Sequence, residues 1–134
     1  MIVSLDTSVL VALILEEEGW EHLDEIVLQH QTLISSVAIV EAFLVLRGRV
    51  QHDVRVSIDR LVESMEIRVI DFSQRHIAIA QDAFDSYGKG RHPAKLNFGD
   101  CIVYATAKMS GTPLLCLGDD FSKTDIDLFQ KTQG

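Results

Sequence analysis

The sequence has no apolar run long enough to cross a membrane. Its longest unbroken run, Val9 to Leu15, has seven residues, whereas a membrane-spanning helix needs about 20. The amino terminus shows no basic segment and no cleavage site of the kind that marks a secreted protein. We therefore expect a cytoplasmic protein with no membrane association.

Cysteine is scarce, and its two occurrences favour neither a disulfide nor a metal site. Cys101 and Cys116 both stand among Ile, Val and Leu, which is typical of core positions in a reducing compartment. The histidines show no metal-ligand spacing, and the first four are predicted at polar helix or loop positions: His22, His30, His52 and His76.

Positive charge is also scarce. The chain has 12 Lys and Arg against 20 Asp and Glu, and its formal net charge is -8. Binding to nucleic acid through bulk electrostatics depends on Lys and Arg neutralising phosphates, so this balance disfavours it. Any contact with nucleic acid must then be local.

What the sequence does contain is an alternation of short strand-like and longer helical segments, with no repeat or linker. The 134 residues suit one domain, 1–134. This alternation predicts an α/β fold whose parallel sheet of four or five strands is covered by helices on both faces. Strands are expected at 2–6, 32–35, 67–72 and 113–118, with a possible fifth at 125–129. Helices are expected at 8–18, 19–30, 36–49, 53–65, 73–88 and 97–110.

Two acidic residues stand where they could serve as helix caps or as functional groups. Asp6 ends the first predicted strand, and Asp100 lies at the third position of a helix that Asn97 would cap. An Asp before a helix accepts a backbone N–H, and an Asp in the first turn favours the helix dipole. Capping alone could therefore explain either residue, and both interpretations stay open.

Glu41 is harder to explain by capping. If Ser36 caps its helix, Glu41 lies beyond the unpaired N–H groups of the first turn, within the apolar stretch "VAIVEAFLVL". The residues three and four positions away on the same helix are apolar, so no neighbour there can neutralise it. An unpaired buried carboxylate costs several kcal/mol or takes up a proton. Either a distant Arg or His pairs with it, or it serves a site.

A fourth acidic feature, Asp119 and Asp120 in "LGDDF", directly follows the last clear strand. By itself it suits a polar loop. However, functional groups of open parallel sheets gather at the carboxyl ends of the strands, where Asp6, Glu41 and Asp100 would also lie. Carboxylates at about 4 Å repel by roughly 4 kcal/mol per pair at an effective dielectric near 20. Such a cluster needs protons, basic partners or a cation.

Carboxylate oxygens without a Cys or His set favour Mg²⁺ or Mn²⁺ over zinc. Such an ion can orient a phosphodiester, activate a water for attack and stabilise the leaving oxygen, so phosphodiester hydrolysis suits the site. The segment "KGRHPAKLN" places Lys89, Arg91 and Lys95 just before the helix with Asp100. These side chains could hold a substrate backbone, or they could simply be solvated.

Four motifs, "LDTSVLVAL", "SSVAIVEAF", "LNFGDCIVYATA" and "LLCLGDDFSKTDI", together resemble the PIN domain. The resemblance runs from residue 2 to about 127 and is specifically to the VapC toxins of type II toxin–antitoxin modules. It implies a three-layer α/β/α endoribonuclease that cleaves RNA with Mg²⁺ or Mn²⁺. It also implies a VapB-type antitoxin, whose tail covers the acidic groove, and a homodimer.

The resemblance assigns roles to individual residues. Asp6, Glu41 and Asp100 align with three of the family's acidic residues, and Asp6 and Asp100 are the metal ligands. Thr7 or Ser8 aligns with a small hydroxyl residue beside the first acid, and both are predicted, like Lys89, Arg91 and Lys95, to bind the substrate. The fourth acid falls at Asp120; its neighbour Asp119, where many members have Asn, is the alternative.

Two other functions remain open. The first is an aspartyl-phosphate protein, a phosphatase or a receiver domain; "DTSVL" lacks the second Asp and the Thr of the phosphatase motif, and the acidic pair and late Lys of receivers are not evident. The second is a non-catalytic interaction domain with the same fold, against which the four acidic positions argue.

Overall fold

The computed structural model describes residues 1–129, and within them the strands form one parallel sheet of four. The strand order is β3-β2-β1-β4, and the register pairs Val3 with Thr32 and Ser4 with Leu114. The predicted domain is 1–134, and its last five residues, 130–134, lie outside the described residues. The strands span Ile2–Leu5 (β1), Gln31–Ser35 (β2), Arg68–Ile70 (β3) and Leu114–Leu115 (β4).

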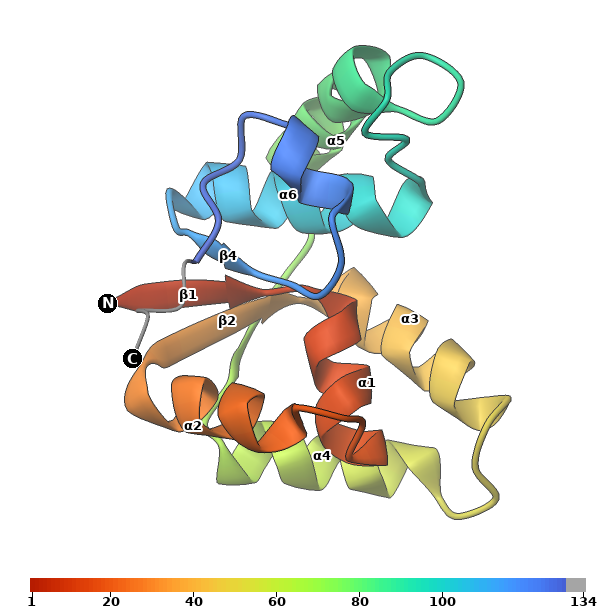
Figure 1. Cartoon of the computed structure of the whole chain (residues 1–134), viewed down its shortest axis with the longest axis vertical. Coiled ribbons are helices and arrows are strands. Elements are labelled where there is room, and N and C mark those ends of the chain that lie inside the picture. The colour runs from red at the N-terminus through yellow and green to blue at the C-terminus, as the bar shows by residue number, and fades with distance from the viewer. Residues whose placement is uncertain (130–134) are drawn as a thin grey trace.

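Helices cover both faces of this sheet, which confirms the predicted three-layer α/β/α fold. In Figure 1, α5 and α6 lie on one side of the strands, and α1, α2 and α4 lie on the other. The helix α3 lies at the carboxyl ends of the strands, near the start of α1. The helices span Thr7–Leu15 (α1), Trp20–Gln29 (α2), Ser36–Arg47 (α3), Val54–Ser64 (α4), Gln74–Tyr87 (α5) and Phe98–Ser110 (α6).

The possible fifth strand is a single bridge rather than a strand. Leu114 pairs with Leu128 in an isolated parallel bridge, with hydrogen bonds from Leu114 N–H to the Asp127 carbonyl and from Phe129 N–H to the Leu114 carbonyl. The strand β4 is also shorter than its apolar pattern predicted. After Leu115 the chain turns away through Gly118, whose φ of +82° suits glycine, into a short 3-10 helix, η1 (Asp120–Lys123).

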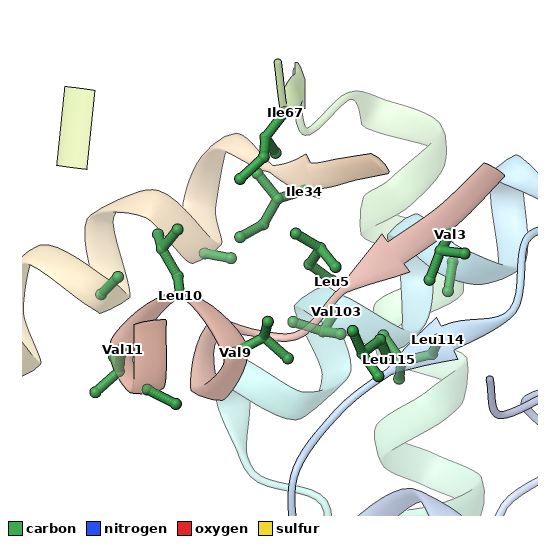
Figure 2. Packing of buried hydrophobic residues seen from close by; sticks show 14 of the residues in the cluster. Val3, Leu5, Val9, Leu10, Val11, Ile34, Ile67, Val103, Leu114 and Leu115 are labelled. Carbon is green, nitrogen blue, oxygen red and sulfur yellow. The ribbon is translucent and has the colours of Figure 1, made fainter. Parts of the chain in front are cut away.

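The core lies between the sheet and its two helical layers. Val3, Leu5 and Ile34 of the strands are at most 1% exposed, and Val9 of α1 and Val103 of α6 belong to the same buried cluster (Figure 2). Burial of each such side chain contributes about 1.5–3 kcal/mol. This packing holds β1 in place, and the carboxyl end of β1 leads directly into α1.

No helix within residues 1–129 has the length and apolar character needed to cross a bilayer.

Two local predictions were wrong. Ser35, not Ser36, caps α3 by accepting the Val37 N–H, while the Ser36 hydroxyl accepts the Phe72 N–H beyond β3. His76 is not at a polar surface position but 3% exposed, because its ring stacks on Phe72 and accepts the Ser73 N–H at the start of α5. Both differences arise from contacts with Phe72, which the local sequence does not reveal.

Candidate active site

Asp6 joins the end of β1 to the start of α1. Its carboxylate caps α1 by accepting the Ser8 N–H at 3.1 Å and also the Ser8 hydroxyl. The residue is 9% exposed, and burial raises its pKa, with the negative charge of Glu41 adding to the effect. Asp6 is therefore a helix cap, as one of its two interpretations proposed. The same side chain also lies at the edge of the sheet where the strands have their C-terminal ends.

The Ser8 hydroxyl connects two segments of the chain at this edge of the sheet. It donates to Asp6 and accepts the N–H of Leu117, at 3.2 Å, from the segment that follows β4. Beside it, Thr7 is 7% exposed, and its hydroxyl has no hydrogen-bond partner within the described part of the chain. Of these two predicted substrate-binding residues, Ser8 is engaged within the protein and Thr7 is not.

Asp100 both stabilises the start of α6 and faces the other acids. Asn97 and Asp100 exchange hydrogen bonds in a capping box: the Asp100 N–H donates to the Asn97 side chain at 2.9 Å, and the Asp100 carboxylate accepts the Asn97 N–H at 3.1 Å. Burial, followed by the charges of Asp6, Asp120 and Glu41, raises the pKa of Asp100 to about 6. The carboxylate thus experiences acids from three other segments of the chain.

Glu41 reaches the same place from α3. It is half-buried, and its carboxylate lies against the α-carbon of Gly99, the residue before Asp100. The ion pairs within residues 1–129 are Arg49–Glu17 and Lys108–Asp125, so no Arg, Lys or His in this part of the chain pairs with Glu41. The alternative of a buried ion pair is therefore wrong for the described residues.

Two acids, Asp119 and Asp120, follow β4 near the other carboxylates. The charge of Asp120 is among the main causes that raise the Asp100 pKa, and Asp120 and Asp119 both raise the pKa of the Cys116 thiol. The Asp119 carbonyl accepts the N–H and hydroxyl of Ser122 at the start of η1. Both side chains are exposed. Asp120 as the fourth acid, with Asp119 as its alternative, stays a prediction.

Cys116 lies near these acids, a position that its apolar neighbours in the sequence do not indicate. Burial, then the charges of Asp6, Asp120 and Asp100, raises the pKa of its thiol to about 12. The thiol is therefore protonated at neutral pH in the metal-free protein. Both cysteines are free, as predicted, although Cys116 is only half-buried. Its place directly after β4 is the signal that could have located it at the carboxyl edge.

The segments that carry these acids come together at one end of the sheet. In Figure 1, α1 and α3 begin at the same end of the strands as α6 begins. The family model of the PIN domain matches residues 3–127, which include all four acids. The chain belongs to the PIN domain family.

One relative of this PIN domain is "Ribonuclease VapC36" of Mycobacterium tuberculosis. The two sequences are 40% identical over 125 residues, and the alignment covers 92% of this chain and 90% of that protein. Its fold is similar to that of VapC20 from the same species, which is described as a sarcin–ricin loop cleaving toxin. The TM-score is 0.78, and the sequences are 16% identical over 96% of this chain and 99% of that one. It is also similar to a chain of VapBC2 from Rickettsia felis, solved bound to promoter DNA, with a TM-score of 0.76 and 15% identity over 97% and 98% of the two chains.

The donor atoms of this PIN domain suit a hard divalent cation. Its acids provide carboxylate oxygens, and the raised pKa values of Asp6 and Asp100 reflect burial and negative charge that no ion pair within residues 1–129 offsets. No three His, Cys, Asp or Glu side chains in that range are arranged to hold a metal. Mg²⁺ is commonly bound by one or two carboxylates while waters complete its shell. Asp6 and Asp100 are the pair available for such binding.

The predicted basic residues lie on the loop between α5 and α6. Lys89, Arg91 and Lys95 are all exposed, and none forms an ion pair within the described residues. The Arg91 guanidinium lies over the Phe84 ring, 5.5 Å from its centroid. Leu96, which is fully buried, anchors the loop. The three cations are thus displayed next to α6 without contacting the acids.

Proposed function

We propose that this PIN domain is the toxin of a VapBC-type module, an endoribonuclease that hydrolyses RNA phosphodiester bonds with Mg²⁺ or Mn²⁺. The observation that carries the proposal is the convergence of Asp6, Glu41, Asp100 and Asp120 on one edge, where no ion pair within residues 1–129 neutralises them. The 40% identity to a VapC ribonuclease supports the choice of RNA as substrate.

Each residue of the site has a place in this proposal. Asp6 and Asp100 hold the ion, which when bound supplies a means to orient the phosphate, activate the attacking water and stabilise the leaving oxygen. Glu41 and Asp120 extend the anionic surface around it and are positioned to accept protons from the attacking water or to hold further solvent. The Ser8 hydroxyl orients Asp6.

Substrate contacts are assigned to exposed cations that form no ion pair within the described residues and to one hydroxyl that has no partner there. The exposed side chains of Lys89, Arg91 and Lys95 bind RNA phosphates, which positions the chain without reading its sequence. The Thr7 hydroxyl, buried beside Asp6 and without a partner in the described residues, is available for a ligand at the site. In this proposal the electrostatic contacts with RNA phosphates come from one loop of an otherwise acidic protein.

The partner in this proposal is a VapB-type antitoxin, in the cytoplasm. Structural relatives of this chain include the VapBC2 complex from Rickettsia felis and a toxin–antitoxin complex from Klebsiella pneumoniae. An acidic site in a chain of net charge -8 is complementary to a basic side chain of a bound peptide. Such a side chain would compete directly with the metal.

A homodimer is the second partner that we propose. Apolar side chains are exposed on three adjacent helices: Val40 and Leu44 on α3, Ile77 on α5 and Phe98 on α6. A cavity of about 870 Å³ lies between these helices. Large exposed apolar patches are typical of protein interfaces. Light scattering should therefore give twice the 15.0 kDa mass of one chain; a monomer mass at micromolar concentration would contradict the dimer.

RNA cleavage by the purified chain, free of antitoxin, tests the proposed activity. We expect endonucleolytic products from total RNA with Mg²⁺ or Mn²⁺ and none when EDTA is present, because the carboxylates alone cannot offset the charge of the transition state. The absence of cleavage with either ion would favour a non-catalytic interaction domain. Trapping of a phosphoryl-enzyme would instead favour an aspartyl-phosphate protein.

A further inference from the structure

Gly99 is where α6 meets the side chain of Glu41. It lies in the first turn of α6, directly before Asp100, and is buried. A Cβ added to Gly99 would lie 2.7 Å from both Cδ and Oε1 of Glu41, and closer still to Oε2. Real Cβ atoms essentially never approach other heavy atoms within 3.0 Å. Any residue other than glycine would therefore displace the Glu41 carboxylate.

The backbone at Gly99 does not itself require glycine. The residue lies within the regular helix α6 and is not among the glycines with positive φ. At such a position Ala stabilises a helix relative to Gly by up to about 1 kcal/mol. The close approach of Glu41 is thus the feature of the structure that accounts for glycine at this position.

The first turn of α6 also attracts a carboxylate electrostatically. The N–H groups of the first turn of a helix lack intrahelical partners, and they carry the positive end of the helix dipole. Glu41 has no ion-pair partner within residues 1–129. Because Gly99 has no side chain, the Glu41 carboxylate can approach this positive end closely.

We propose that Gly99 is a positioning residue, which seats the Glu41 carboxylate against α6 and next to Asp100. The inference rests on the proposed function in one respect, namely that Glu41 acts in RNA hydrolysis. The contact itself is independent of that function. Glu41 has a flexible side chain, so a methyl group at position 99 moves the carboxylate out of place and leaves the fold intact.

Gly99→Ala tests the proposal in the wild-type background. We expect its kcat for RNA cleavage with Mn²⁺ to fall on the order of 100-fold, because displacing a catalytic group by about 1 Å can cost that much. KM should change much less, because the basic loop is untouched. Gly48→Ala is the matched control: a Cβ there meets only the Val45 carbonyl at 3.6 Å, and Gly48 ends the helix that carries Glu41. It should cleave at the wild-type rate.

The same substitution in a Glu41→Ala background separates the contact from the activity. With the carboxylate removed, Gly99→Ala should raise the midpoint of thermal unfolding by about 3 °C, as expected for Gly→Ala in a helix, and should lower kcat no further. In the wild-type background the midpoint should not rise.

The outcomes distinguish the two hypotheses. Wild-type cleavage by the Gly99→Ala protein, or the same change in unfolding midpoint with and without Glu41, would overturn the positioning role. If the wild-type protein cleaves no RNA, the proposed function fails, while the two unfolding comparisons still decide whether Gly99 seats Glu41.

Discussion

Replacing Asp100 by Asn is expected to lower the rate of RNA cleavage by on the order of 1,000-fold while making the metal-free protein more stable. Loss of a ligand removes about 4 kcal/mol of the stabilisation that a bound ion gives the transition state, and each 1.36 kcal/mol is tenfold in rate. The Asn side chain can still accept the Asn97 N–H, which preserves the capping box of α6. Single-turnover cleavage assays with Mn²⁺ measure the loss.

The stability gain follows from the raised pKa of Asp100. Burial and the neighbouring acids raise this pKa from 3.8 to about 6. A carboxyl group with a raised folded-state pKa stabilises the fold while it is protonated, so its contribution is complete below about pH 3.8 and is lost as the pH rises through about 6. At pH 7.5 in EDTA, Asp100→Asn removes this unfavourable charge and should raise the unfolding midpoint.

A matched control for this substitution is Asp59→Asn, at an exposed position on α4. It should leave both cleavage and the unfolding midpoint unchanged within error. Wild-type cleavage by Asp100→Asn would mean either a contaminating nuclease or a site elsewhere. A lower midpoint in EDTA would show that the charge of Asp100 is compensated in the folded protein.

Binding of Mn²⁺ is expected to weaken about tenfold for each pH unit below pH 6, because the ion must displace the proton on Asp100. The pKa of that carboxyl is about 6, and burial raises the pKa of Asp6 as well. The dependence should steepen where both carboxyls are protonated and should level off above the higher of the two pKa values. Calorimetric titrations between pH 5 and 8 measure it.

Acid unfolding must be separated from this effect. Thermal unfolding without metal over the same pH range provides that control, since the raised pKa of Asp100 predicts no loss of stability at mild acidity. An affinity for Mn²⁺ that is the same at pH 5 and pH 7 would contradict a site built from these carboxylates.

Local sequence patterns predicted several helix boundaries because they depend on neighbouring residues. Asn97 and Asp100 form the expected capping box, and Gly111 ends α6 with a positive φ of 66°. The same kind of reasoning failed at Ser36, because two adjacent hydroxyls can both cap a helix and a contact with Phe72 decides between them. Local chemistry thus predicts that a helix begins, and tertiary contacts select the residue that caps it.

The gathering of the acids could be predicted because parallel strands place their carboxyl ends on one edge. The contacts that organise this edge could not, since they join distant segments of the chain. The Ser8 hydroxyl meets the N–H of Leu117, and the carboxylate of Glu41 meets Gly99. Neither contact follows from periodicity or composition, because each depends on how α1, α3 and α6 pack around the sheet.

The central claim is that Asp6 and Asp100, 94 positions apart in the sequence, together hold one divalent ion. Calorimetric titration of Mn²⁺ into the wild-type protein, Asp6→Asn and Asp100→Asn tests it without RNA or turnover. We predict that the wild-type protein binds Mn²⁺ and that each substitution alone weakens binding on the order of 100-fold, because mutation of even an outer-shell partner of a metal ligand costs roughly 10–100-fold in affinity. Wild-type affinity in either variant would contradict a shared site.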